Sequence, residues 1–170
     1  MAAPVDAGRA TTSISTAADP WGTVNLPGSI ASGDLLVGWT RFPTATGFAG
    51  ASAPTGWSLL GGVGNESPDA SDDTNYVFCR VSAGGEPASE SWDMAASVKG
   101  CAIIWRITGA GNRVTGAAIT TIDINNIAME ISSATITTGA NINAASFTPS
   151  IPGGTKDYLW LCLIGMDSET

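Results

Sequence analysis

Short runs of β-branched and aromatic residues, each ended by Gly, Pro, Ser, Asp or Asn, recur throughout this chain of 170 residues. Such runs are typical of β-strands, whereas helix caps and apolar stripes with a period of 3.6 residues are scarce. Many short strands at this spacing predict an all-β fold, an antiparallel two-sheet β-sandwich, in one domain spanning residues 1–170. The expected strands lie near residues 9–16, 22–26, 34–42, 57–63, 75–83, 90–94, 100–108, 117–122, 127–138 and 157–165.

The alternation of side chains predicts which face of each strand is buried. In "YVFCRV" (76–81), we assign the face of Val77, Cys79 and Val81 to the core and leave Arg80 on the other face. In "CAIIWRI" (101–107), Arg106 points away from the apolar side, so this strand is expected to be half solvated. The predicted core consists of Leu35, Val37, Trp39, Val77, Cys79, Ile103, Trp105, Leu159, Leu161 and Leu163.

Two segments, "DLLVGW" and "YLWLCLI", are apolar on both faces. This pattern is typical of central strands covered on both sides. The cover is expected to come either from a second sheet and a loop or from a neighbouring subunit.

Composition excludes several functions. Fifteen acids against seven bases give a net charge of −8, which disfavours a nucleic-acid partner because the phosphate backbone would be repelled. The chain has no histidine, so Ser-His-Asp and Cys-His nucleophile activation are excluded, and we predict no catalytic or cofactor-binding residue and no cofactor. No segment reaches the roughly 18 consecutive apolar residues of a membrane helix, and no signal peptide is recognised at the start, so no membrane partner is expected.

The three cysteines, Cys79, Cys101 and Cys162, each lie inside an apolar run. We expect them to be small buried hydrophobes that remain thiols, because free cysteine is among the most buried residue types. A Cys79–Cys101 bridge stays open if those two strands pair.

The densest acidic stretch is "NESPDASDD", and its acids are Glu66, Asp69, Asp72 and Asp73. Its Ser, Pro and Gly neighbours predict a solvated loop, so no metal is assigned. Calcium binding is the sharper alternative, because hard cations take several loop oxygens, although the spacing of an EF-hand is not met. A carboxylate pair for glycoside hydrolysis would also have to come from here, but the stretch lacks a fixed apolar frame.

One internal similarity links residues 26–39 with residues 148–162. Each segment has a proline-containing approach, a glycine-bearing turn, an Asp that opens a strand, and an apolar run with a tryptophan. The chain ends soon after the second copy, so we expect a C-terminally incomplete half whose edge is covered by an earlier segment or by another chain. Residues 111–146 are rich in Ile, Thr, Ala and Asn with hardly any charge, which predicts an assembly segment or a loop.

Five segments together resemble a pattern of jelly-roll-like sandwich domains in tailed-phage virion proteins. That family carries a Gly-Asp-Leu-Leu strand, then Pro-x-Gly-Trp, then a Tyr-x-x-x-Arg-x-Ala strand ending in Gly-Glu-Pro, then an aromatic strand and an apolar strand ending in Gly. The resemblance covers roughly residues 24–110 and, more loosely, 147–165. The segments are "GDLLVGW" (33–39), "PTGWSLL" (54–60), "YVFCRVSAGGEP" (76–87), "SWDM" (91–94) and "AIIWRITGA" (102–110).

The resemblance implies a non-enzymatic structural protein of a phage-like particle, a capsid decoration protein or a tail or fibre component, acting through subunit assembly. It implies a virion location after synthesis in the host cytoplasm, with partners among other virion proteins and copies of the chain itself, and a host-surface glycan as a further partner. The alternative is a carbohydrate-binding module or adhesin domain, which needs exposed aromatics on one surface. The residues expected to carry the structural motif are Asp34, Trp57, Arg80, Glu86 and Trp105.

Two of these residues, Glu86 and Trp57, could have a functional role instead of a structural one. Glu86 lies between Gly84-Gly85 and Pro87, where a carboxylate accepts nearby backbone N–H groups, so a role in holding the turn is favoured over catalysis. Trp57 is expected to plug the end of the sandwich rather than to serve as a platform for a sugar, because tryptophan is largely buried on average.

Overall fold

The computed structural model describes residues 4–14, 23–42, 54–63, 74–92, 99–110, 159 and 161. Every regular element in these ranges is a strand and every strand pairing is antiparallel, so the described part of the chain is all-β, as predicted. Within the same ranges, no helical segment has the length and apolarity that a membrane span requires.

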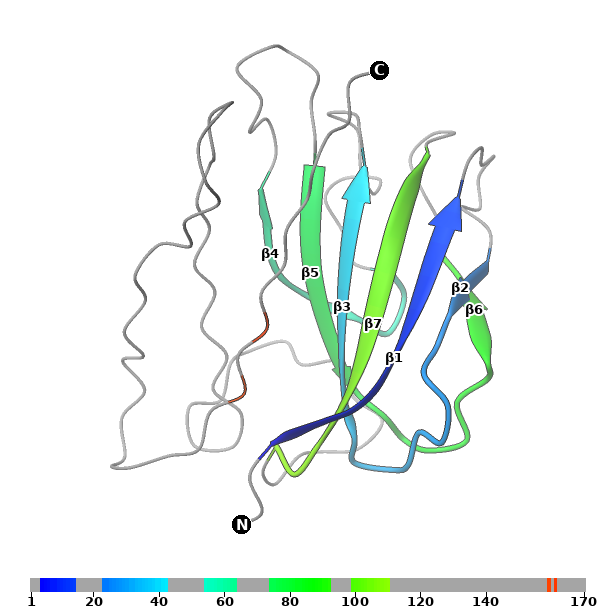
Figure 1. Cartoon of the computed structure of the whole chain (residues 1–170), viewed down its shortest axis with the longest axis vertical. Helices are drawn as coiled ribbons and strands as arrows, with labels where there is room; N and C mark the ends of the chain where they lie inside the picture. Colours follow the sequence, from blue (N-terminus) through cyan, green and yellow to red (C-terminus); the bar gives the residue numbers. More distant parts are fainter. Residues whose placement is uncertain are drawn as a thin grey trace, which may run out of the picture.

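The strands form one sheet of five and one of two (Figure 1). The five-stranded sheet has the order β1 (Val5–Ile14), β7 (Gly100–Thr108), β3 (Leu35–Phe42), β5 (Thr74–Val81) and β4 (Ser58–Val63). The two-stranded sheet pairs β2 (Thr23–Asn25) with β6 (Ser89–Ser91). Each strand matches a predicted one within a few residues. The strands predicted at 117–122 and 127–138, and nearly all of 157–165, lie outside the described residues.

One face of the five-stranded sheet, here called face A, is built on Leu36, Phe42, Phe78, Ala102 and Ile104. These side chains are buried together with residues in and beside the two-stranded sheet and with Trp57, which precedes β4. The residues that pack over face A from outside it are Val24, Leu26, Trp57 and Trp92, with Ile30 partly buried against them.

The opposite face, face B, carries Leu35, Val37, Trp39, Cys79, Trp105 and Ile107, all of them buried. The predicted core residues Val77, Ile103, Leu159 and Leu161 are half-buried and pack against this cluster, while Leu163 lies outside the described residues. The chain itself therefore supplies part of the cover on both faces of β3, in which every residue except Arg41 is buried.

The prediction that the faces of Arg80 and Arg106 lie outside the core is wrong. Both arginines belong to face A, and their neighbours there, Phe78 and Ile104, are each 0% exposed. Strand β7 is accordingly not half solvated. Alternation shows which residues share a face, but it does not show that β2, β6 and Trp57 cover face A.

Candidate functional site

Two arginines lie on either side of Leu36 at one end of face A. Leu36 on β3 is opposite Arg80 on β5 and opposite Arg106 on β7, and directly opposed residues of an antiparallel pair share a face. Each guanidinium is only partly exposed, with side-chain exposures of 12% for Arg80 and 17% for Arg106. Charges this deeply placed require partners, and Arg80 has two acidic partners while Arg106 has one.

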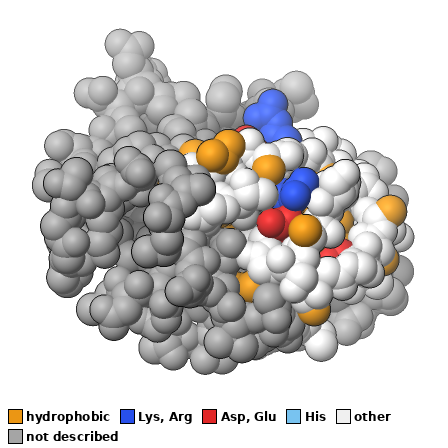
Figure 2. Space-filling model, turned by 90° about the horizontal axis from the view of Figure 1, so that it is seen from below, with side chains coloured by type: hydrophobic (Ala, Val, Ile, Leu, Met, Phe, Trp, Pro, Cys, Tyr) orange, Lys and Arg blue, Asp and Glu red, His pale blue; other side chains and the backbone are white. Residues whose placement is uncertain are grey.

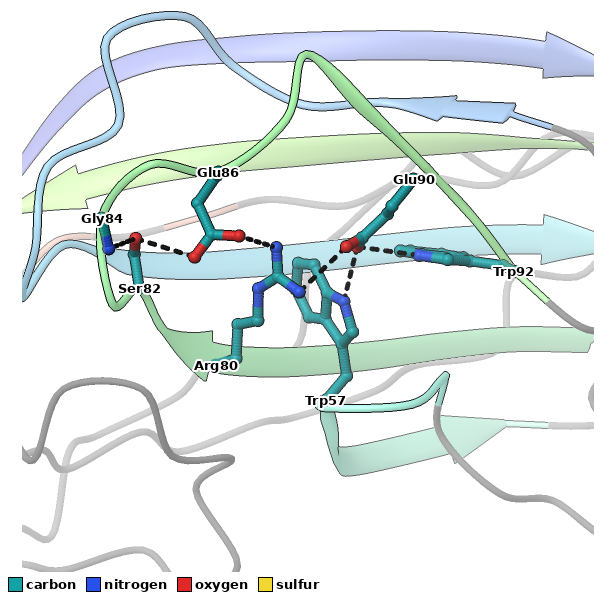
Figure 3. A network of polar contacts seen from close by, with 7 residues as sticks. All are labelled: Trp57, Arg80, Ser82, Gly84, Glu86, Glu90 and Trp92. Carbon is teal, nitrogen blue, oxygen red and sulfur yellow. Dashed lines mark hydrogen bonds and ion pairs between the residues drawn. The ribbon is translucent and has the colours of Figure 1, made fainter.

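Arg80 bridges two glutamates that come from outside the five-stranded sheet (Figure 3). Its Nη1 donates to Oε2 of Glu90 on β6 at 2.9 Å, and its Nη2 donates to Oε2 of Glu86 at 2.8 Å. The guanidinium carbon also lies 4.7 Å from the centre of the Trp57 ring, a cation–π distance. Arg80 thus fastens β6 and the loop before it onto β5.

Glu90 is the acceptor at the centre of this network. Its Oε1 accepts hydrogen bonds from Nε1 of Trp57 at 2.7 Å and from Nε1 of Trp92 at 2.9 Å. Figure 3 shows both indoles with their N–H groups turned towards this carboxylate. A buried indole N–H needs an acceptor, and one oxygen serves both rings.

Glu86 holds the turn in which it lies, although not through the backbone N–H groups that the sequence suggested. Its Oε1 accepts a hydrogen bond from Oγ of Ser82 at 2.9 Å, and Ser82 Oγ in turn accepts one from the backbone N–H of Gly84 at 2.9 Å. Gly84 and Gly85 have φ angles of 88° and 72°, which only glycine adopts without strain. A chain of side-chain contacts therefore ties this glycine turn to Arg80.

The second arginine is fixed by the residue that opens β3. Oδ2 of Asp34 accepts hydrogen bonds from Nε of Arg106 at 2.6 Å and from the backbone N–H of Ala31 at 2.8 Å. The backbone of Asp34 also accepts from the N–H of Ser82 at 2.8 Å. The prediction that Arg106 points into solvent is therefore wrong. Its guanidinium binds Asp34, which lies 72 residues earlier in the chain.

All four carboxylate oxygens of Glu86 and Glu90 accept a hydrogen bond from a protein donor. A general acid or base must instead reach a proton on its substrate. In the structure, the contacts of this pair join the two-stranded sheet and the glycine turn to β5.

The other residues singled out from the sequence lie elsewhere. Trp105 is on face B, on the opposite side of the sheet from this network. The calcium candidates Glu66, Asp69, Asp72 and Asp73 lie outside the described residues. Within the described ranges, no three acidic or cysteine side chains are grouped as a metal site would require.

Sequence reasoning missed Glu90, the acceptor on which the network depends. A usable signal was present, because Glu90 and Trp92 are two residues apart in one extended segment and so share a face. A carboxylate placed beside a tryptophan that must be buried is a candidate acceptor for its indole N–H.

Cys79 and Cys101 are free thiols, as predicted. Cys79 on β5 is opposite Val37, and Cys101 on β7 is opposite Arg41, so the two cysteines lie on either side of β3 and four residues apart along it. Two strand spacings alone separate them by about 10 Å, beyond the roughly 7 Å between Cα atoms that a disulfide spans. The alternative of a Cys79–Cys101 bridge is therefore wrong, and Cys162 lies outside the described residues.

Figure 2 shows the molecule from below, with basic and acidic side chains side by side on the described surface. Hydrophobic side chains on this part of the surface are scattered and do not form one continuous patch. Comparisons with protein-family models, curated proteins and solved structures found no match. Any functional assignment therefore depends on the residues themselves.

Proposed function

We propose that this chain is a non-enzymatic structural protein of a phage-like particle, a capsid decoration protein or a tail or fibre component, which acts through subunit assembly in the virion. The observation that carries the proposal is the convergence of the motif segments. Asp34, Trp57, Arg80, Glu86 and Trp92 come from four of the segments that resemble virion domains, and all take part in the polar contacts at one end of face A. A structural role for these residues is consistent with the proposal, because their contacts join separate strands and turns.

The proposed architecture is a two-sheet, jelly-roll-like sandwich. In support, the two-stranded sheet reaches across face A, because Asn25 of β2 is bonded to Thr11 of β1 while Glu90 of β6 is bonded to Arg80 of β5. Packing of one sheet over another buries the inner faces of both, and Val24 on β2 is 0% exposed.

Assembly is expected to depend on apolar contacts more than on ion pairs. With a net charge of −8, copies of the chain repel one another at long range, and few bases are present to pair with the acids. A stable interface buries about 1,200–2,000 Å² in total and is most apolar at its centre. The segment 111–146, expected to contribute to such an interface, lies outside the described residues.

The alternative of a sugar-binding module requires aromatic rings that a ligand can reach. Trp39, Trp57, Trp92 and Trp105 are between 1% and 7% exposed, so these four rings are not available for stacking. Trp21 and Trp160 lie outside the described residues.

Light scattering coupled to size-exclusion chromatography, in 0.15 M and 1 M salt, tests the proposal together with a glycan array. We expect oligomers that persist in 1 M salt, where exposed charges are screened within about 3 Å, and no specific glycan signal. A chain that stays monomeric at high concentration and binds one glycan class would contradict the proposal and support the sugar-binding module.

A further inference from the structure

Strand β1 is an edge of the five-stranded sheet and has one sheet neighbour, β7, among the described strands (Figure 1). Its second half is engaged by β2, because Asn25 donates through Nδ2 to the carbonyl of Thr11 at 3.3 Å and through its backbone N–H to Oγ1 of Thr12 at 2.9 Å. Its first half is exposed at Val5, Asp6, Ala7 and Arg9, with Val5 54% exposed. The open part of this edge is therefore residues 5–10.

A bulge places two opposite charges on the same face of this open segment. Asp6 is opposite Ile107 and Arg9 is opposite Trp105, and both of these β7 residues lie on face B. Residues three apart in a regular strand would point to opposite faces, but the register shift between Asp6 and Gly8 adds one residue. The bulge is held by the N–H of Gly8, which donates to Oδ1 of Asp6 at 2.9 Å.

We propose that a second copy of this chain docks on this edge, with the two β1 strands antiparallel about a two-fold axis between Ala7 and Gly8. In this register, Asp6 of each copy is opposite Arg9 of the second copy and on the same face, so two cross-strand ion pairs form. Val5 of each copy is opposite Ala10 of the second copy, which covers the most exposed hydrophobic side chain of the strand. The axis bisects residues 5–10, the whole of the open segment.

Charge complementarity selects a second copy as the occupant. Charged side chains and bulges ordinarily protect an edge strand from unselective pairing. Here the bulge and the two charges favour a partner strand that places a positive charge opposite Asp6 and a negative charge opposite Arg9. An antiparallel copy of β1 meets that requirement. Neither Asp6 nor Arg9 has an ion pair with another described residue.

This inference rests on the proposed assembly function and names one of its contacts. Pairing of six residues buries less than the roughly 1,200 Å² of a stable standard interface. The dimer is therefore weak, depends on protein concentration and weakens in salt, because exposed charges are screened. Weak contacts of this kind gain strength when many copies are held on one particle.

Charge reversal tests the register. Sedimentation velocity at rising protein concentration, in about 50 mM salt where screening is weak, compares the wild type with Asp6→Arg and Arg9→Asp. Each single variant places like charges opposite each other twice, so its dimer dissociation constant is expected to rise about tenfold or more. An equimolar mixture of the two variants restores both ion pairs and dimerises, as does the double variant Asp6→Arg/Arg9→Asp.

Two control variants separate an effect of the ion pairs on dimerisation from an effect of net charge or of misfolding. Lys99→Glu changes the net charge as Arg9→Asp does, at an exposed site outside β1, and is expected to dimerise like the wild type. Asp6→Asn keeps the acceptor for Gly8 but removes the charge, so it weakens the dimer with an unchanged circular dichroism spectrum. If neither single charge reversal changes the dissociation constant, or if the mixture of the two variants does not dimerise, the β1 pairing is overturned and the proposed assembly still stands. A wild type that is monomeric at every concentration would overturn both.

Discussion

Trp57 and Trp92 donate their indole N–H groups to the same oxygen, Oε1 of Glu90, at 2.7 and 2.9 Å. Their rings also meet edge to face, with centroids 5.5 Å apart and planes at 70°. Trp57 directly precedes β4, the edge strand farthest from β1, while Trp92 directly follows β6. One carboxylate oxygen thus fixes the two-stranded sheet relative to the far side of the five-stranded sheet, and Arg80 holds that carboxylate in place.

Removal of Arg80 should destabilise the fold strongly. Arg80→Met leaves the mostly buried carboxylates of Glu86 and Glu90 without their shared cation, and loss of one partner of such a pair costs about 2–4 kcal/mol. Urea denaturation measures the free energy of unfolding. Lys99→Met removes one positive charge at an exposed site and should change this free energy by less than about 0.5 kcal/mol. Similar losses in the two variants would show that Arg80 acts only through net charge.

The two glutamates should differ in their contribution to stability. Glu90→Ala removes a carboxylate that accepts from three donors, whereas Glu86→Ala removes one that accepts from two, one of them the Ser82 hydroxyl in a turn. We expect Glu90→Ala to cost about 1–3 kcal/mol more than Glu86→Ala in urea denaturation. The native tryptophan emission should shift to the red in Glu90→Ala alone, because only that variant removes the oxygen that accepts from both indole N–H groups. An equal cost with unchanged emission would contradict the assignment of Glu90 as the central acceptor.

Gly38 should not tolerate a side chain. It lies in the middle of β3 on face A, and a Cβ there would meet Cδ1 of Ile104 at 3.0 Å and the ring of Trp57 at 3.4 Å. Gly38→Ala should therefore cost about 1–3 kcal/mol by overpacking, measured as a lower midpoint of thermal unfolding. Gly28→Ala is the matched control, since its Cβ would meet nothing within 4 Å. Equal midpoints for the two variants would mean that face A is packed more loosely than these distances imply.

Stability should fall at alkaline pH because of Cys79. Burial raises the pKa of this thiol from its usual value of 9.0 to about 12. Between these values the unfolded chain loses the proton while the folded chain keeps it, so the free energy of unfolding decreases as pH rises, by at most about 1.4 kcal/mol per pH unit.

The comparison with Cys79→Ala isolates this effect from the other groups that titrate at high pH. The variant loses packing at every pH, but its disadvantage against the wild type should shrink by about 2 kcal/mol between about pH 8.5 and 10.5. Urea denaturation at both pH values supplies the four free energies. A difference that stays constant over this range would show that the thiol is reached by water in the folded state.

The sequence by itself determined where the strands lie and which residues share a face. The run 100–108 was predicted to be a strand and is one, and the run 34–42 matches β3 except at Asp34. These features are local, because β-branched residues, turn residues and alternation act over a few positions. The same local pattern marked Cys79 and Trp105 correctly as buried.

Only the tertiary structure decided that the face of Arg80 and Arg106 is also a core face, and that Glu90 joins it. Alternation cannot say whether a face is covered, because the cover comes from contacts between residues remote in the sequence. The Trp57–Glu90 hydrogen bond spans 33 positions and the Asp34–Arg106 ion pair spans 72. From the sequence alone, an arginine in a strand is predicted to be exposed to solvent, because burial of its charge is unfavourable without acidic partners. Only the tertiary structure shows that such partners are present.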